Sequence, residues 1–351
     1  MKIGLVRRGH SATGGAEAYL LRFAAEAARI GHEPVLITTS DWPRGRWPHP
    51  GLIQIPGRTP AEFASAFAKT SAGCDVVMSL ERVPGCDVFR AGDGVHAAWL
   101  ERRGEFESWW RRAVRRWNPK HGQILRLERE VFNPAQTGWI IANSRMVSDE
   151  IARFSPFPAD RIQVVYNGFQ PFEKWPDRAE SRRALGLGDE FCVLFVGSGW
   201  ERKGLATAMA AIEMTEDACL LVAGRGPADL YRSEKAKFLG PVSDLPRIFA
   251  AADVFVLPTW YDPFSNACLE ALAAGLPVVT TQANGCAEIL TPGVHGSVVD
   301  PGDALAIAEQ LDFWKKRAAG AGPACRELAA GFSIQRNVTE TLAVLERAKS
   351  A

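Results

Sequence analysis

Short apolar runs alternate with amphipathic stretches along most of this chain. The apolar runs are rich in Val, Leu, Ile and Phe and have the length of a buried strand, whereas the stretches between them carry apolar residues at helical spacing. This alternation predicts an α/β protein with parallel sheets. The strands are predicted at residues 2–6, 33–38, 52–55, 75–79, 87–90, 138–142, 162–165, 191–196, 219–223, 253–257, 277–280 and 296–299, and the helices at 18–29, 145–154, 245–252, 267–274, 304–314 and 333–349.

The stretch 258–279 (PTWYDPFSNACLEALAAGLPVV) holds two carboxylates between two of these strands. Asp262 lies in the loop, and Glu270 lies about one turn inside the following helix, for which Ser265 or Asn266 is the expected N-cap. Open parallel sheets bind ligands outside the carboxyl ends of their strands. We therefore expect a polar ligand to meet both acids and the N–H groups of the helix start.

Two glycine-containing turns follow predicted strands. The sequence GSGWERKG at 197–204 offers backbone N–H groups and the cations of Arg202 and Lys203, which suits a diphosphate. It is not a Walker loop, because the order of residues differs. Gly14 and Gly15 stand at the first strand-to-helix turn, and such a pair either lets a phosphate approach the backbone or marks a tight turn.

Length and composition narrow the class of protein. A chain of 351 residues with 47% hydrophobic and 23% charged residues is typical of two globular domains. A net charge of +1 argues against a dedicated nucleic-acid binder. The seven cysteines are scattered and never form C-x-x-C, which suits a reducing cytoplasm. Because neither a signal peptide nor a membrane-spanning run is evident, we expect a cytoplasmic protein.

Residues 99–129 combine basic residues with tryptophans. Nine Lys or Arg stand against four Glu, an excess of five positive charges, with Trp99, Trp109, Trp110 and Trp117 interleaved. This composition suits the surface of an anionic bilayer. Two alternatives remain open: stacking of nucleotide bases, which nothing else in the chain supports, and a solvated basic helix whose tryptophans pack inward.

The stretch that begins at Asp262 resembles the signature of a large enzyme family. Asp-Pro-Phe-Ser, then Leu-Glu-Ala, then Gly275-x-Pro277-Val-Val, is similar to the motif of retaining GT-B glycosyltransferases of the family 4 type, which include bacterial lipopolysaccharide-core glucosyltransferases. Their usual motif is Glu-x7-Glu. Here the spacing from Asp262 to Glu270 is kept, but the first acid is one methylene shorter. A glycine-rich loop that ends in Arg-Lys-Gly, as this one does at Gly204, is also found in the family.

The resemblance implies a GT-B fold, in which two Rossmann-like domains with parallel sheets face a donor cleft. It divides the chain into an N-terminal acceptor domain (1–168), a linker (169–188), a C-terminal nucleotide-sugar domain (189–332) and a final helix (333–351) that returns to the N-terminal domain.

The resemblance also implies the site residues. In the family the glycine-rich loops and the cations hold the donor phosphates, the second acid holds the ribose and the first acid holds the hexose. The donor-binding residues carried over are Gly14, Gly15, Gly197, Arg202, Lys203, Arg225, Val242, Asp262, Phe264, Ser265, Asn266, Ala267 and Glu270. The catalytic set is Asp93, His96, Arg202, Lys203 and Asp262.

Asp93 and His96 have a second interpretation, in which Asp93 is a helix N-cap and His96 lies on the surface. No Asp-x-Asp occurs in the chain, so no metal site and no cofactor are expected. Cations then have to stabilise the leaving nucleoside diphosphate.

The function implied is transfer of a hexose from a nucleotide sugar, with UDP-glucose as the first choice, to a saccharide or lipid-linked acceptor such as lipopolysaccharide core, with retention of configuration. We expect the enzyme to be peripheral on the inner face of the cytoplasmic membrane, through residues 99–129, and to bind no nucleic acid. Two alternatives are a sugar-nucleotide epimerase of the same fold and a membrane-associated protein with a decayed site.

Overall fold

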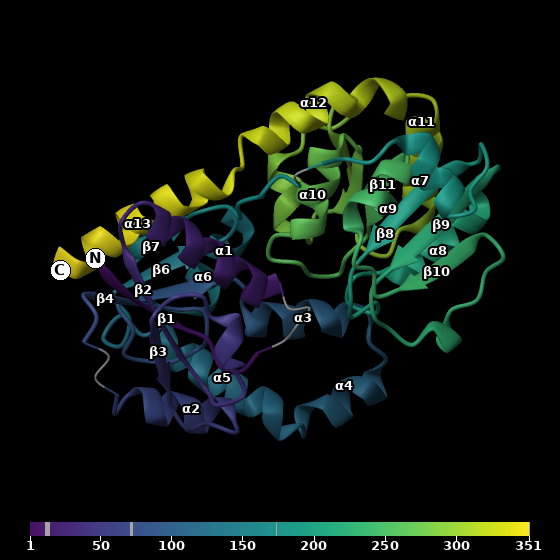
Figure 1. Cartoon of the computed structure of the whole chain (residues 1–351). Helices are drawn as coiled ribbons and strands as arrows, with labels where there is room; N and C mark the ends of the chain where they lie inside the picture. Colours follow the sequence, from purple (N-terminus) through teal and green to yellow (C-terminus); the bar gives the residue numbers. More distant parts are fainter. Residues whose placement is uncertain (11–14, 71–72, 173, 351) are drawn as a thin grey trace. The chain divides into compact units, whose positions relative to one another are not determined.

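The computed structural model describes residues 1–10, 15–70, 73–172 and 174–350, of which residues 44, 114 and 116 are described by their backbone alone. Contacts between Cα atoms divide the chain into two compact units (Figure 1). The first unit comprises residues 1–168 together with 334–351, and the second comprises residues 169–333.

The first unit is built on a parallel sheet. Within the described residues it has seven strands in the order β3-β2-β1-β4-β5-β6-β7. Buried residues, most of them apolar, fill the five inner strands, as expected for a sheet that helices cover on both faces, whereas the edge strands β3 and β7 are half-buried or exposed. The strands are β1 (Lys2–Val6), β2 (Glu33–Thr38), β3 (Gly51–Gln54), β4 (Val76–Ser79), β5 (Val88–Ala91), β6 (Trp139–Ala142) and β7 (Ile162–Val164).

Two groups of helices cover this sheet. The C-terminal helix α13 packs against α1 and against β4, β5 and β6, and its residues Ile334, Val338 and Leu342 join the core of the first unit. Helix α5 packs against α2 and α3, and α3 also contacts α6. The helices are α1 (Gly15–Arg29), α2 (Pro60–Phe67), α3 (His96–Phe106), α4 (Trp109–Arg116), α5 (Pro119–Val131), α6 (Arg145–Phe154) and α13 (Ile334–Ser350).

The second unit is built on another parallel sheet. Its described part has six strands in the order β10-β9-β8-β11-β12-β13. The strands β8, β9, β11 and β12 are almost wholly buried. The strands are β8 (Phe191–Val196), β9 (Ala218–Ala223), β10 (Ala236–Gly240), β11 (Val254–Leu257), β12 (Val278–Thr281) and β13 (Gly296–Val299).

The helices of the second unit also form two groups. Helix α8 packs with α11 against β9, β11 and β12, whereas α10 packs with α9 and α12. The helices are α7 (Arg178–Ala184), α8 (Leu205–Met214), α9 (Leu245–Ala251), α10 (Asn266–Ala274), α11 (Ala304–Lys315) and α12 (Ala318–Ala330). Short 3₁₀ turns lie at Arg44–Arg46, Ala159–Arg161, Ala228–Leu230 and Gly285–Ile289.

The hydrophobic pattern predicted most of these elements. The α/β class with two parallel sheets is confirmed, and the predicted strands are present to within one or two residues. Strand β10 and helices α2, α8 and α12 were not predicted. In the part of the chain that the structure describes, no helix has both the length and the apolar character needed to cross a bilayer.

Candidate functional site

Four loops leave the carboxyl ends of strands in the second unit. They follow β8, β9, β11 and β12 and comprise residues 197–204, 224–227, 258–265 and 282–285; we call them the donor-side loops. Strands β8 and β11 are neighbours in the sheet, although β9 and β10 intervene in the sequence (Figure 1). The strand order therefore reverses between them, and ligands of open α/β sheets bind at such a switch point.

Glycines let the donor-side loops touch through their backbones. Gly204 has a left-handed φ of 75°, and a Cβ there would lie 1.9 Å from the carbonyl oxygen of Pro258. Gly224, with φ 128°, lies equally close to Gly197, since its Cβ would lie 1.9 Å from the Gly197 carbonyl oxygen. No side chain fits at either position. The loop after β8 is therefore held directly against the loops after β9 and β11.

Two cations of the loop 197–204 reach the loop after β11. Lys203 Nζ lies 2.9 Å from Asp262 Oδ2, and both side chains are largely buried. The Arg202 guanidinium donates to the carbonyl oxygen of Tyr261, while the Arg202 carbonyl accepts from the backbone N–H of Trp260 at 2.8 Å. The structure thus joins Arg202 and Lys203, which were predicted to bind the diphosphate, to the loop of Asp262, which was predicted to bind the hexose.

The Asp262 carboxylate is ionised in this setting. Burial by itself raises the pKa of Asp262. The charges of Lys203 and Arg202, together with hydrogen bonds from Lys203 and the Phe264 backbone N–H, lower the pKa by more than burial raises it, so the pKa lies below its ordinary value. The result is a buried carboxylate between two cations at the mouth of the sheet.

Asn284 fixes the start of helix α10 beside Asp262. Its Oδ1 accepts from the backbone N–H of Ser265 at 3.2 Å and of Cys286 at 3.1 Å, and its Nδ2 donates to Thr280 Oγ1 at 3.0 Å. Asn284 was not among the predicted site residues. An asparagine between two predicted strands does not by itself indicate a role in the sequence. Its role is evident only in the fold, which places its side chain beside the first residues of α10.

The remaining predicted residues of the stretch lie at the start of α10. Ser265 is the N-cap, although its hydroxyl makes no capping hydrogen bond. Asn266 and Ala267 are the first two residues of the helix, and both are half-buried, as is Glu270 one turn further on. Phe264 is buried.

Three further predicted residues, Gly197, Arg225 and Val242, follow the ends of β8, β9 and β10. The backbone N–H of Arg225 donates to Ser198 Oγ at 3.1 Å, which joins Arg225 to the residue after Gly197. The Arg225 side chain is exposed. Val242 is half-buried and follows the end of β10, whose Gly240 carbonyl accepts from the Gly224 N–H at 2.8 Å.

The predicted residues of the first unit lie after β5. Asp93 is exposed, and His96 is the first residue of α3. The alternative that Asp93 is a helix N-cap is wrong, because the N-cap is Val95. The Glu128 carboxylate caps this helix instead, accepting from the backbone N–H groups of His96 at 2.6 Å and Ala97 at 3.0 Å.

His96 is also not a plain surface residue. Its Nε2 lies 3.0 Å from Nδ1 of His121, and the two rings stack. Burial, then the nearby charges of Arg82, His121 and Arg115, lower the pKa of His96 to about 4. His96 is therefore neutral at pH 7 and is able to accept a proton only in acid.

The glycine pair of the first unit is only partly described. Gly14 lies outside the described residues, and Gly15 begins α1. Near this helix start, Arg7 forms ion pairs of 3.1 Å with both Glu17 and Glu81. This buried cluster at the carboxyl ends of β1 and β4 was not predicted from the sequence.

Residues 99–129 form parts of three helices, α3, α4 and α5. The side chains of Trp109, Trp110 and Trp117 are 80%, 53% and 89% exposed, so the alternative in which the tryptophans pack inward is wrong for these three. The buried Glu107 carboxylate joins α3 to α4 through ion pairs to Arg103 at 3.1 Å and to Arg115 at 2.9 Å. The described segment therefore presents indoles and guanidinium groups to solvent.

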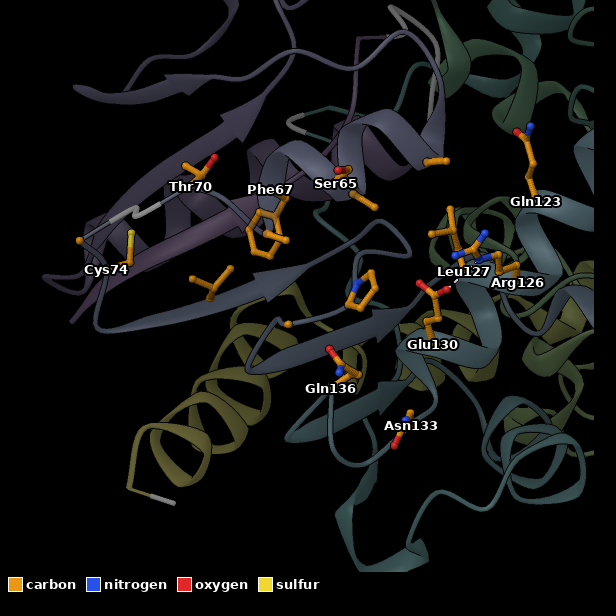
Figure 2. A pocket seen from close by; sticks show the side chains of 17 residues that line it. Ser65, Phe67, Thr70, Cys74, Gln123, Arg126, Leu127, Glu130, Asn133 and Gln136 are labelled. Carbon is orange, nitrogen blue, oxygen red and sulfur yellow. Dashed lines mark hydrogen bonds and ion pairs between the residues drawn. The ribbon is translucent and has the colours of Figure 1, made fainter.

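A pocket of about 1090 Å³ lies elsewhere in the first unit, between α2 and α5 (Figure 2). Its lining mixes apolar residues such as Phe67 and Leu127 with Gln123, and the ion pair of Arg126 and Glu130 lies at its wall. It contains none of the predicted site residues that the structure describes. Among all the residues that the structure describes, there is no group of three or more His, Cys, Asp or Glu arranged to hold a metal ion.

Comparison with protein families matches both halves of the chain. Residues 13–171 match the model described as Glycosyltransferase Family 4, and residues 190–314 match the model described as Glycosyl transferases group 1.

Two related proteins are similar in sequence. An uncharacterised glycosyltransferase of Methanocaldococcus jannaschii is 34% identical over 203 residues. The matched segment covers 52% of this chain and 52% of that protein, so the match spans about half the length of each. The lipopolysaccharide glucosyltransferase WaaG of Escherichia coli is 24% identical over 315 residues, 82% of each chain.

Solved structures show the same fold. The crystal structure of WaaG, a glycosyltransferase involved in lipopolysaccharide biosynthesis, superposes with a TM-score of 0.81 at 20% identity, covering 98% of this chain and 99% of that one. Anabaena HepE, solved in complex with UDP-glucose, superposes with a TM-score of 0.76 at 20% identity over the whole of both chains. The chain therefore has the GT-B fold.

Proposed function

This chain belongs to the glycosyltransferases of group 1 and family 4, and on that premise we propose that it moves a hexose from a nucleotide sugar to a saccharide or lipid-linked acceptor. UDP-glucose is the proposed donor, and lipopolysaccharide core is the proposed kind of acceptor. The chain's likeness to HepE, which binds UDP-glucose, supports the first choice. Its similarity to the lipopolysaccharide glucosyltransferase WaaG supports the second.

The observation that carries the proposal is the group formed by Arg202, Lys203 and Asp262 at the switch point of the second sheet. Two adjacent cations on a glycine-rich loop suit the two phosphates of a nucleotide sugar. A buried, ionised carboxylate within reach of the same cations suits hexose hydroxyls, which donate hydrogen bonds to it. Glu270, one turn into α10, accepts from the ribose hydroxyls in this arrangement.

The proposed reaction retains the configuration of the anomeric carbon. The bond from this carbon to the β-phosphate oxygen breaks, and the acceptor oxygen forms the new bond on the same face. The acceptor proton passes to the departing phosphate oxygen, so no enzyme nucleophile is needed. Arg202 and Lys203 stabilise the charge that develops on the leaving diphosphate, which is the work that a metal ion does in other transferases. Asp93 and His96 are proposed to contact the acceptor or the hexose.

A thermal-shift titration tests the donor assignment. UDP-, GDP- and ADP-sugars are added to the protein with and without magnesium, and binding to the folded state raises the unfolding midpoint by mass action. We expect UDP-glucose to raise it equally in both conditions, and Arg202→Ala to abolish the rise. Lys316→Ala, which removes an exposed cation of the same unit, is the matched control. No shift with any nucleotide sugar would overturn the donor site.

Product analysis separates the proposed transfer from its alternatives. A transferase releases the nucleoside diphosphate only as it glycosylates an acceptor, whereas an epimerase converts the sugar nucleotide without an acceptor. A decayed site converts nothing. The anomeric configuration of the glycosylated product, read by NMR, tests retention.

The proposed acceptor chemistry extends to the membrane surface. The exposed indoles of Trp109, Trp110 and Trp117 and the arginines between them fit a peripheral contact with an anionic bilayer. This proposal places the enzyme on the inner face of the cytoplasmic membrane, where a lipid-linked acceptor is within reach.

A further inference from the structure

Trp200 lies within the loop 197–204, two residues before Arg202, yet its side chain is only 3% exposed. Its indole Nε1 donates to the carbonyl oxygen of Gly197 at 2.9 Å, which closes the loop on itself. Its own carbonyl oxygen accepts from the Leu205 N–H at 3.0 Å, at the first residue of α8. Both ends of the loop are therefore tied to this one residue.

The indole also contacts strand β10 and the segment between β9 and β10. Its ring centroid lies 5.6 Å from that of Tyr231, edge to face, and 5.5 Å from that of Phe238 on β10. The backbone of Gly226 lies against the ring, since a Cβ at Gly226 would lie 2.2 Å from Trp200 Cδ2. One side chain thus joins the loops after β8 and β9 to strand β10.

The loop that carries the two cations needs such an anchor. Gly199 and Gly204 have left-handed φ values of 74° and 75°, and glycine-rich backbone loses more conformational freedom on ordering than other backbone does. Without a residue that fixes the loop, the backbone around Arg202 and Lys203 would sample many conformations. A pre-organised loop binds its ligand without that cost.

We propose that Trp200 is a positioning residue for the nucleoside diphosphate: it fixes the loop 197–204 so that Arg202 and Lys203 meet both phosphates. The inference rests on the proposed function for its ligand. Its structural half, that the indole orders the loop, does not depend on any ligand.

Calorimetric titration with UDP, GDP and ADP tests the binding half. Trp200→Phe keeps a ring against Tyr231 and Phe238 but loses the hydrogen bond to Gly197, and we expect affinity for the preferred nucleotide to fall about fivefold, as for the loss of one hydrogen bond. Trp200→Ala should bind more weakly still. Trp314→Phe is the control: this indole is 1% exposed and donates to Ser297 Oγ at 2.9 Å in the same unit, and its loss should leave affinity unchanged.

A second substitution tests the contact with Gly226. The φ of Gly226 lies outside the left-handed region, so the indole is what opposes a methyl group there. We expect Gly226→Ala to weaken nucleotide binding in the otherwise unchanged protein and to add little in the Trp200→Ala background. Equal effects in the two backgrounds would overturn the inference.

Hydrogen exchange without nucleotide tests the structural half. The amides of Lys203, Gly204 and Leu205 donate within or beside the loop, and we expect them to exchange at least about tenfold faster in Trp200→Ala, because local opening then costs less. Trp314→Phe should not change them. Unchanged exchange would overturn the inference.

The two kinds of failure are distinguishable. If the unchanged protein binds none of the nucleotides, the proposed function fails. The role of Trp200 in positioning the cations for a diphosphate then fails as well, because there is no ligand to bind. If it binds one of them and both Trp200 variants bind it equally well, the proposed function stands and the inference alone fails.

Discussion

Lys203 Nζ lies 2.9 Å from Asp262 Oδ2, although the two residues are 59 positions apart in the sequence. The pair bridges the loops that follow β8 and β11, the two strands between which the chain changes direction across the sheet. In the proposed donor site, an incoming diphosphate would meet a lysine that already has a carboxylate partner. Asp262 orients Lys203 in the structure described, and its charge keeps the pair close to neutral.

Removing Lys203 should cost stability as well as donor affinity. Lys203→Ala leaves the Asp262 carboxylate buried with Arg202 as its nearest cation, and we expect a loss of about 3 kcal/mol in the free energy of unfolding, as for other broken buried pairs. Asp262→Asn, combined with Lys203→Ala, should restore part of this loss because no unpaired charge is left. Urea unfolding of the unchanged protein, the two single variants and the double variant measures the coupling, and strictly additive effects would refute it.

Much of the fold was predictable because apolar periodicity records burial directly. The strand of residues 191–196 is apolar throughout and is buried on both faces of the second sheet. The helix predicted at 267–274 does end at Ala274, where Gly275 follows with a left-handed φ of 91°. These signals are local, so the sequence alone contains them.

Other elements depend on contacts that the sequence does not show. Helix α12 contains Pro323 and two glycines, which are poor helix signals, but it packs against α10, where Gly275 and Gly322 let the backbones approach. The ion pair of Lys203 with Asp262 was likewise not predicted, because the motifs assigned one residue to the phosphates and the other to the hexose. Only the strand order brings them together.

The histidine pair of the first unit should make stability depend on pH. Burial, followed by the charges of Arg82, His121 and Arg115, lowers the pKa of His96 from 6.5 to about 4. The unfolded chain takes up this proton at a higher pH than the folded chain does, so stability contributed by the neutral ring is present above pH 6.5 and is lost as the pH falls towards 4. The pKa of His121 is lowered as well, first by burial, so its contribution has the same sign.

Chemical denaturation at several pH values between 7 and 4 checks this dependence. His96→Gln should flatten the fall in unfolding free energy over that range. His10→Gln is the control, since the His10 ring packs edge-on against Trp42. An unchanged slope in His96→Gln would show that the pair does not titrate as the contacts imply.

The exposed tryptophans should determine binding to anionic membranes. We expect Trp109→Ser combined with Trp117→Ser to lower the fraction of protein that floats with vesicles of anionic phospholipid, because interfacial indoles lose their apolar contact with the bilayer. Leu230→Ser with Leu305→Ser removes two exposed apolar side chains from the second unit and should have no effect. Binding to the vesicles should also weaken as the salt concentration is raised, since salt screens the attraction between exposed basic side chains and anionic lipids. Equal flotation of both double variants would contradict the assignment.

Gly204 and Gly199 provide a matched test of how tightly the donor-side loops must pack. Both have left-handed φ values, 75° and 74°, so alanine incurs a similar backbone cost at each, about 1 kcal/mol. Only at Gly204 would the added Cβ meet backbone, at 1.9 Å from the Pro258 carbonyl oxygen, whereas at Gly199 it would meet nothing within 4 Å.

Gly204→Ala should therefore be the more damaging of the two. The loop 197–204 then has to move away from Pro258, which separates Lys203 from Asp262 and misplaces both cations. We expect Gly199→Ala to keep most of the nucleotide affinity and Gly204→Ala to lose at least about tenfold, since each 1.4 kcal/mol of lost binding free energy is one factor of ten. Calorimetry with the preferred nucleoside diphosphate measures both variants. Similar losses at the two glycines would mean that backbone conformation, and not the contact with Pro258, governs this loop.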